Sequence, residues 1–89
     1  MVITANKLLG LLVKDKSGRI LGTIKDFEVD LDNTQIIRYI ISPSKLVEKI
    51  LVTELIIDQS QVVEITEEMM LVESGLVNSQ VNPKEAIAN

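Results

Sequence analysis

A stretch of nearly alternating apolar and polar residues, 18–30, constrains the fold more than any other part of the chain. Successive side chains of a β-strand point to opposite faces, so this pattern predicts a strand with one buried and one solvated face. The flanking residues 15–18 and 30–33 are rich in Asp, Ser, Gly and Asn, which favour turns. We therefore predict a long strand with a hairpin turn at each end.

The alternation changes phase within this strand. Ile24 is one residue out of step with the apolar positions Phe27 and Val29. Because a shift of one residue exchanges the two faces of a strand, we predict a β-bulge or a sharp bend near Lys25 and Asp26. The Asp26 carboxylate is expected to accept a hydrogen bond from the turned backbone there. A strand that bends at this point contributes to two sides of a small barrel.

The composition favours strands over a helical bundle. At 89 residues the chain is expected to form one domain with a single compact core. It contains 12 Ile, 11 Leu and 10 Val residues, but one Phe, one Tyr and no Trp. Such a core is aliphatic and rich in β-branched residues, which pack well on pleated sheets. We predict a mainly β fold, a small antiparallel β-barrel of five or six strands with a short C-terminal helix and a tail.

Short, closely spaced strands are predicted along the chain, which suits a small barrel. After a lead-in at residues 1–6, which we expect to be an edge strand, the predicted strands are 8–16, 19–30, 34–41, 49–52, 56–58 and 61–65, the last two paired as a hairpin. Gly10 indicates a bulge or a close backbone approach, and Gly18 supplies the left-handed conformation of a hairpin turn. Structural turn or bend positions are assigned to Gly10, Gly18, Gly22, Asp26, Asp32 and Asn33, the last two because Asp and Asn tolerate positive φ.

The pattern changes at Thr66. A capping hydroxyl followed by two acidic residues is typical of a helix start, and Gly75 is typical of a helix end. We predict a helix of about two turns between them, which is too short to stand alone and docks through residues 69–72. The chain is thus divided into one domain, residues 1–75, and a flexible tail, residues 76–89.

Charge and residue types exclude several functions. The net charge is −4, divided as +1 in residues 1–44 and −5 in residues 45–89, and an acidic domain repels nucleic-acid phosphates and anionic lipids. The chain has no His and no Cys, so the commonest general base, thiol nucleophile and thiolate metal ligand are missing. No apolar run approaches the ~20 residues that span a bilayer. We predict a cytoplasmic, non-enzymatic protein without a cofactor, a metal or a membrane span, and the charge disfavours nucleic acid as its partner without excluding it.

Four carboxylates recur at every second position: Asp26, Glu28, Asp30 and Asp32. On a regular strand they share one face, which leaves open a site for a hard cation or a solvated strand face. Residues 30–35 lack the glycine and the terminal glutamate of a calcium-binding loop. The solvated face is therefore favoured.

The third predicted strand is apolar on both faces, although one face carries Arg38 between two isoleucines. A neighbouring segment of the same domain or a second subunit would cover the outer face, and the residues alone leave both alternatives open. The methionine-rich residues 69–72 add further apolar surface. We predict a protein interface, with a two-fold homodimer as the commonest geometry, at Ile36, Arg38, Ile40, Met69, Met70, Leu71 and Val72.

Spaced glycines, acids and aliphatic residues give the chain a resemblance to a known family. The residues that carry it are Leu9-Gly10-x-x-Val13, Asp15-x-x-Gly18-x-x-Leu21-Gly22-x-Ile24-x-Asp26-Phe27-x-Val29-Asp30, and the hydrophobic strand 36–41. Over residues 8–65 this pattern resembles the PRC-barrel family, named after the H subunit of the photosynthetic reaction centre. The resemblance implies a small, mostly antiparallel barrel used as an adaptor.

The resemblance also implies a functional context. Short archaeal members of the family are associated with the cell-division apparatus, where they are partners of the ring anchor SepF. We therefore expect an adaptor that binds itself and another protein, such as SepF, in a cell-division or membrane-associated assembly. The alternative is a ribosome or RNA-processing accessory similar to the barrel domain of the ribosome maturation factor RimM.

Overall fold

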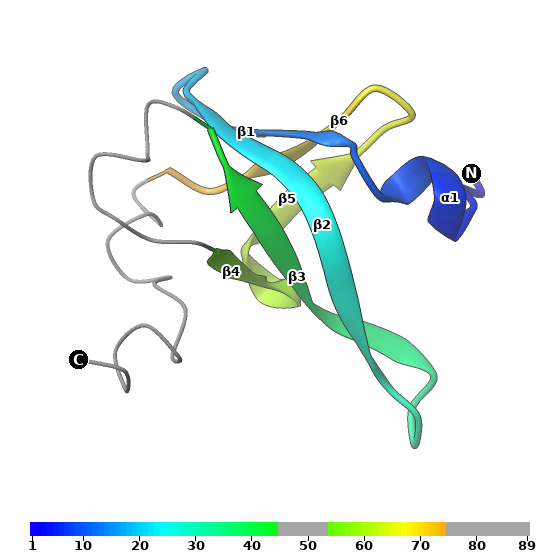
Figure 1. The fold of residues 1–89 in the computed structure, drawn as a ribbon. Helices are drawn as coiled ribbons and strands as arrows, with labels where there is room; N and C mark the ends of the chain where they lie inside the picture. The colour runs from blue at the N-terminus through cyan, green and yellow to red at the C-terminus, as the bar shows by residue number, and fades with distance from the viewer. Residues whose placement is uncertain (45–53, 75–89) are drawn as a thin grey trace.

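The fold is mainly β. The computed structural model describes residues 1–44 and 54–74, and Figure 1 shows their arrangement. In chain order the elements are helix α1 (Ala5–Leu8), strands β1 (Leu12–Asp15), β2 (Ile20–Asp30), β3 (Gln35–Pro43) and β4 (Leu55–Asp58), the 3-10 turn η2 (Gln59–Gln61), and strands β5 (Val62–Ile65) and β6 (Met69–Val72). The predicted strands 19–30 and 34–41 are confirmed by β2 and β3. The predicted strand 49–52 and the tail 76–89 lie outside the described residues.

All six strands belong to one curled sheet, in the order β4-β3-β2-β1-β6-β5. Figure 1 shows β5 and β6 behind the layer formed by β1, β2 and β3. Neighbouring strands are antiparallel except β1 and β6, which are parallel. Among residues 1–44 and 54–74 the sheet is open, because no ladder joins β4 to β5 at its two ends. The prediction of a mainly β fold is confirmed, whereas its closure into a barrel is not observed in this part of the chain.

Two predicted elements differ in the structure. The hairpin of residues 56–58 and 61–65 is wrong, because β4 pairs with β3 and β5 pairs with β6. A capping box explains the difference. The Asp58 carboxylate accepts a hydrogen bond from the Ser60 amide at 3.1 Å, and the Gln61 side chain accepts one from the Asp58 amide at 2.8 Å. These bonds form η2, which leads the chain across the core instead of back along β4. The predicted lead-in strand is also wrong, because Thr4 caps α1 there.

The predicted C-terminal helix is wrong. Residues 69–72 form strand β6, which lies between β1 and β5. The Thr66 hydroxyl does accept hydrogen bonds from the amides of Glu68 and Met69, at 3.1 and 3.2 Å, as a helix cap would. The Thr66 amide, however, donates to the Met69 carbonyl at 2.9 Å, which closes a tight turn between β5 and β6. The same capping pattern thus serves a hairpin, because burial of alternate residues in β6 completes the core.

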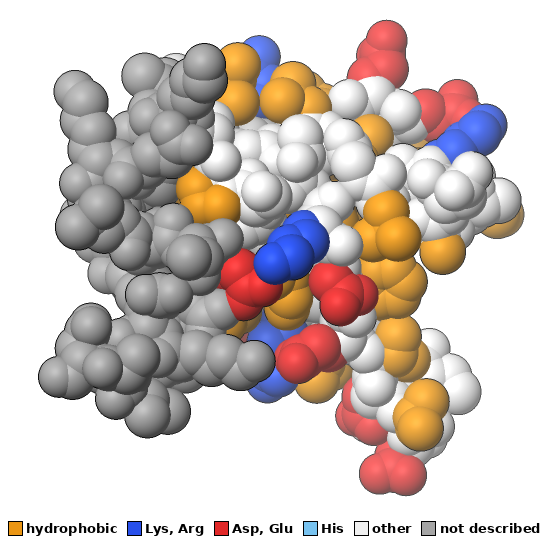
Figure 2. All heavy atoms as spheres, viewed as in Figure 1, with side chains coloured by type: hydrophobic (Ala, Val, Ile, Leu, Met, Phe, Trp, Pro, Cys, Tyr) orange, Lys and Arg blue, Asp and Glu red, His pale blue; other side chains and the backbone are white. Residues whose placement is uncertain are grey.

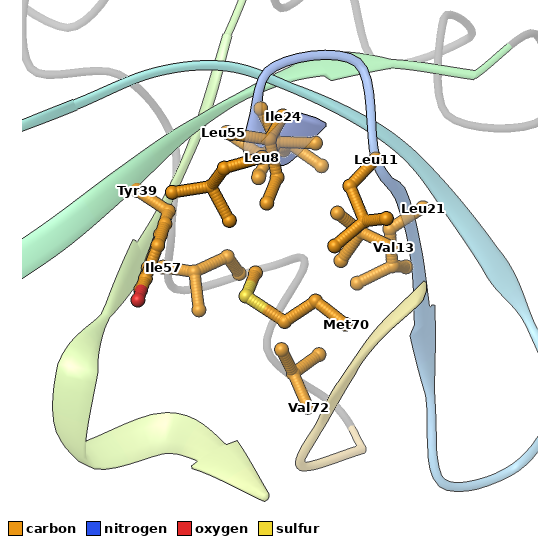
Figure 3. Packing of buried hydrophobic residues seen from close by; sticks show 11 residues of the cluster. Leu8, Leu11, Val13, Leu21, Ile24, Tyr39, Leu55, Ile57, Met70 and Val72 are labelled. Carbon is orange, nitrogen blue, oxygen red and sulfur yellow. The ribbon is translucent and has the colours of Figure 1, made fainter. Parts of the chain in front are cut away.

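The core is aliphatic and draws on every strand except β5 (Figure 3). Its buried members are Leu8, Leu11, Val13, Leu21, Ile24, Tyr39, Ile41, Leu55, Ile57, Met70 and Val72. Phe27, Ile36, Val62 and Ile65 pack against this cluster from its margins. Met70 and Val72 are completely buried, which contradicts their prediction as interface residues.

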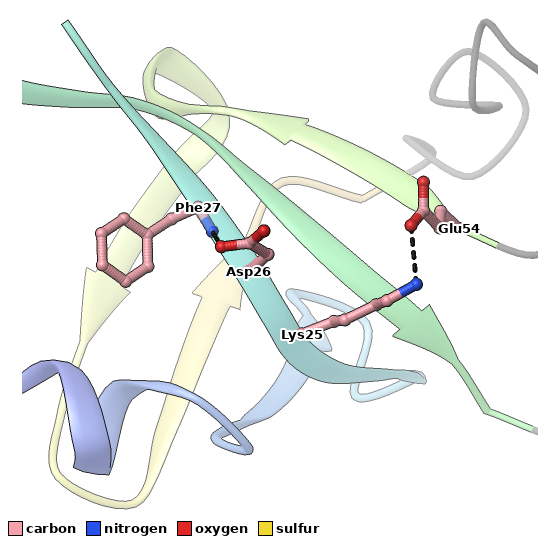
Figure 4. Close-up of polar contacts among 4 residues, drawn as sticks. All are labelled: Lys25, Asp26, Phe27 and Glu54. Carbon is pink, nitrogen blue, oxygen red and sulfur yellow. Dashed lines mark hydrogen bonds and ion pairs between the residues drawn. The ribbon is translucent and has the colours of Figure 1, made fainter.

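The predicted bulge in the long strand is confirmed. The pairing of β2 with β3 shifts between Ile24 and Asp26, so Lys25 is the extra residue. The shift brings both Ile24 and Phe27 to the core side. The Asp26 carboxylate accepts a hydrogen bond from the Phe27 amide at 2.8 Å, as expected, and Figure 4 shows this contact beside the bulge.

A second register shift reverses the prediction for Ile36. The pairs Glu28–Arg38 and Val29–Ile36 leave Ile37 as an extra residue on β3. Ile36 therefore packs against the core and not on the outer face that carries Arg38. The bulge also places Val29 opposite Ile36 on the inner side of the sheet.

The predicted turns hold with two corrections. Gly18 adopts a φ of +90° between β1 and β2, as expected, and Gly10 adopts +93° between α1 and β1 instead of inside a strand. In the turn after β2 the left-handed residue is Thr34, with a φ of 54°, and not Asp32 or Asn33. The Asp30 carboxylate fixes this turn, since it accepts hydrogen bonds from the Asp32 amide and the Asn33 side chain at 2.9 and 2.8 Å.

Asp15 anchors the turn between β1 and β2. Its residue is 4% exposed, and its carboxylate Oδ1 accepts hydrogen bonds from the Ser17 hydroxyl at 2.6 Å and from the amides of Ser17 and Arg19, each at 3.0 Å. Burial alone raises the pKa of Asp15, but these hydrogen bonds and the Arg19 charge together hold the pKa below its usual 3.8. The charged form is thus the one that the fold stabilises.

Replacing Asp15 by asparagine is expected to reduce the free energy of unfolding at neutral pH by about 1–2 kcal/mol, because a charge-assisted acceptor becomes neutral. The folded pKa lies below the unfolded pKa, so this stabilisation is present above the unfolded pKa and is lost as the pH falls through the folded pKa. Urea unfolding at a series of pH values measures it. The wild-type protein should lose more stability than Asp15→Asn on acidification, and equal losses would contradict the assignment.

Candidate functional site

The described part of the chain shows no cluster of His, Cys, Asp and Glu side chains. It has no His and no Cys, and residues 1–44 and 54–74 contain no group of three or more potential metal ligands. Three of the four carboxylates of the predicted solvated face are held by local contacts: Asp26 at the bulge, Glu28 by Arg38, and Asp30 in the turn. Two surfaces of the described residues are considered as candidate sites.

The first surface is the outer face of β3 and β4. Ile40 lies opposite Ile56 across this strand pair, and both side chains are half-buried. Arg38 lies opposite Asp58 on β4 and forms an ion pair with Glu28 on β2, with Nη1 and Oε1 2.5 Å apart. A row of alternating charges across three strands thus borders an apolar pair.

The charges of this face are fixed by local contacts. A hydrogen bond from the Ser60 hydroxyl, then one from the Ser60 amide, lowers the pKa of Asp58 against a small effect of burial, and the Arg38 charge lowers it further. At the other end of the face Lys25 forms an ion pair with Glu54, with Nζ and Oε2 2.7 Å apart (Figure 4). Asp58 is therefore charged at neutral pH, and the neighbouring cations already have acidic partners.

The structure divides the predicted interface. Arg38 and Ile40 lie on the outer face of β3, while Met69 and Leu71 are half-buried on β6. Strands β2 and β1 separate these two places in the sheet. Ile36, Met70 and Val72 point to the core. The predicted residues therefore do not form one patch.

The second surface, which the sequence analysis missed, is the projecting end of the β2–β3 hairpin. We call residues 26–37 the arm: β1 pairs with β2 only as far as Thr23, and β4 pairs with β3 only from Arg38. Figure 1 shows the arm extending beyond the rest of the sheet, and Figure 2 shows acidic and hydrophobic side chains side by side on it. Val29 is 43% exposed and Leu31 is 84% exposed.

The reason why the sequence analysis did not predict the arm can be identified. Val29 continues the apolar alternation of residues 18–30, which predicts that its side chain faces the buried side of the strand, whereas Leu31 lies in the predicted turn 30–33. The sheet narrows to two strands at the arm, so nothing among the described elements covers these side chains. The signal available in the sequence is the length of β2 and β3, which exceeds that of β1 and β4, the strands on either side of this pair.

A small curled β-sheet with an aliphatic core, an outer charged face and a projecting arm defines a small β-domain. A family model of the PRC-barrel domain matches residues 1–75 of the 89. The chain belongs to the PRC-barrel family, as its sequence pattern indicated. A search of curated proteins finds no match. Within the described ranges no helix is long and apolar enough to cross a membrane.

Proposed function

We propose that the chain is a non-catalytic adaptor that binds another protein. PRC-barrel domains are generally non-catalytic binding modules, and the family covers most of this chain. The observation that carries the proposal is the arm, on which the aliphatic residues Val29 and Leu31 are exposed. An exposed apolar strip on a projecting, hydrogen-bonded hairpin is typical of a surface that another protein covers.

The proposed context is a cell-division or membrane-associated assembly, with a division-ring component such as SepF as the partner. The family resemblance supports this context. The RNA-processing alternative has less support, because Lys16, Lys25 and Arg38 form ion pairs with carboxylates of the same chain. Neutralised cations contribute little to phosphate binding, which depends on counterion release.

Affinity purification from the source cells, followed by mass spectrometry, tests the adaptor role. The wild-type chain is expected to retain a protein that also binds it after both are purified separately. A mobility-shift assay with cellular RNA at physiological salt tests the alternative. An RNA complex with steep salt dependence, and no protein complex, would overturn the proposal.

We further propose that the adaptor is a homodimer that pairs through the outer face of β3 and β4. Replacing Ile40 by glutamate should then raise the dimer dissociation constant at least tenfold, because each desolvated aliphatic side chain contributes ~1.5–3 kcal/mol. Light scattering should give twice the 9.9 kDa chain mass for the wild type and the single mass for Ile40→Glu.

The matched control is Val63→Glu on β5, where the side chain is 44% exposed and far along the sheet order from β3. This variant should remain dimeric, and circular dichroism should show that both variants are folded. A monomeric wild type refutes the dimer, and equal dissociation of the two variants refutes its placement.

A further inference from the structure

A hollow lies at the base of the arm, between the arm and η2. Its volume is about 350 Å³, and its lining residues are Gln35, Ile36 and Tyr39 of β3 and Gln59 of η2. Two side-chain amides, one phenol and one aliphatic side chain therefore meet at one concave place. No predicted site included it, because β3 and η2 come together only through the pairing of β4 with β3, which the sequence analysis did not predict.

The hydroxyl of Tyr39 is the unusual feature of the hollow. The residue is 3% exposed, and its ring packs in the core, while Figure 3 shows the hydroxyl oxygen at the edge of the cluster. No hydrogen bond joins this hydroxyl to another described residue, and its oxygen is not buried but reaches solvent, while Tyr39 lines the hollow. Burial raises the pKa of Tyr39, so the hydroxyl keeps its proton at neutral pH. A nearly buried phenol without a protein partner is a donor for a bound group.

An apolar strip continues from the hollow along the arm. Ile36 lines the hollow and lies opposite Val29, which is 43% exposed. Beyond Val29 the exposed Leu31 stands in the turn that the Asp30 carboxylate fixes by two hydrogen bonds. A strip held in this way loses little conformational entropy when it is covered.

The charge around this strip is negative. Residues 26–37 contain four carboxylates and no Lys or Arg. A hydrogen bond from the Asn33 side chain, then one from the Asp32 amide, lowers the pKa of Asp30, and the pKa of Asp58 beside η2 is lowered as well. These groups are charged at neutral pH, and such a field attracts cationic side chains.

We propose that the hollow and the strip dock an extended segment of a partner protein that carries an aliphatic side chain flanked by Lys or Arg. The aliphatic side chain packs on Ile36 and Val29. A backbone carbonyl of the segment accepts the hydrogen bond of the Tyr39 hydroxyl, and the amides of Gln35 and Gln59 bind neighbouring backbone groups. The basic side chains face the carboxylates of the arm. This inference rests on the proposed adaptor function and names the site and the chemistry of its partner.

Fluorescence polarisation with synthetic probes tests the site on the full chain. The probes are labelled twelve-residue peptides with central Leu and Ile residues and Lys or Arg on both sides, a version with Ser at the centre, and a version with Glu on both sides. The first probe should bind at least tenfold more tightly than the other two at ~0.15 M salt. Amide shifts in NMR spectra should fall on the arm, β3 and η2.

Two variants assign the binding to the proposed residues. Val29→Lys should lower the affinity for the first probe at least tenfold. Val63→Lys on β5 makes the same charge change at an equally exposed residue and should leave this affinity unchanged. Tyr39→Phe should weaken it about three- to tenfold, as the loss of one hydrogen bond predicts. Its melting temperature should stay the same or rise, because the hydroxyl has no protein partner to lose.

Several outcomes would overturn the site. The first probe could fail to bind, or Val29→Lys and Val63→Lys could weaken its binding equally. The NMR amide shifts could be confined to other strands, or Tyr39→Phe could markedly destabilise the protein. Concentration-dependent shifts of the amides of the arm and η2 in the free protein would show that a second copy is the occupant and would also overturn it. If the wild type and Val29→Lys retain the same cellular partner equally, the adaptor function stands and this site fails. If the wild type retains no protein, the proposed function itself fails.

Discussion

Replacing Gly22 by alanine is expected to lower the free energy of unfolding by about 3–5 kcal/mol, which is a large part of the total for a small domain. A Cβ atom at this position would lie 1.9 Å from the Ser42 carbonyl oxygen and 2.9 Å from its carbon. The backbone also has a φ of +153°, which side chains other than hydrogen rarely allow. Urea unfolding followed by circular dichroism measures the loss.

The neighbouring contacts explain why the strands do not simply separate. The Ser44 amide donates to the Leu21 carbonyl at 2.9 Å, and the Ser44 hydroxyl donates to the Ile20 carbonyl at 3.1 Å. These bonds hold β3 against β2 on the side of Gly22 where the ladder ends. A shift of the Ser42 backbone away from a new methyl group would therefore break other hydrogen bonds.

Gly18→Ala is the matched control. Gly18 also has a positive φ, +90°, but a Cβ atom there meets nothing within 4 Å. Its loss should be only about 1–2 kcal/mol, from backbone strain alone. If Gly22→Ala and Gly18→Ala lose the same stability, the close approach of Gly22 to Ser42 has no energetic weight.

The long strand and its bulge were predictable from sequence because their cause is local. Ile24 and Phe27 are both apolar and differ in phase, so a strand that buries both must bulge between them. The aliphatic composition likewise required a sheet with one buried side. These features follow from residue order alone, without knowledge of which strands are neighbours.

The pairing of distant strands was not predictable in the same way. The residues around Thr66 satisfy a helix cap and a tight turn equally well, and only the place for Met70 between β1 and β5 decides in favour of the turn. The bulge at Ile37 has no signature either, since apolar residues lie on both sides of it. Tertiary packing selected one of two local solutions in each case.

The candidate sites were only partly predictable for the same reason, because they depend on strand pairing. The prediction that Ile36 faces outward failed because of the bulge at Ile37, whereas Arg38 and Ile40 do lie on the outer face. The hollow around Tyr39 was beyond sequence analysis, because it needs the pairing of β4 with β3, which places η2 beside residues 35–39. A surface that forms where distant segments meet leaves no pattern in either segment.

Replacing Met70 by alanine is expected to lower the free energy of unfolding by about 2–5 kcal/mol, the usual loss for a large side chain removed from a core. Met70 is 0% exposed, and Figure 3 shows its sulfur among the buried aliphatic side chains, near Ile57. The side chain comes from β6 and fills the space between the two layers of the curled sheet. Urea unfolding, at protein concentrations that differ tenfold, measures the loss.

Met69→Ala provides the comparison within the same strand. Met69 is half-buried, because alternate residues of β6 face the core. Its loss should stay below about 1 kcal/mol, since the side chain already contacts solvent in the folded state. We expect Met70→Ala to lower the free energy of unfolding much more than Met69→Ala at every protein concentration. Similar losses for both residues would indicate that β6 does not alternate between core and surface. If the loss of unfolding free energy caused by Met70→Ala disappeared on dilution, Met70 would lie in a subunit interface.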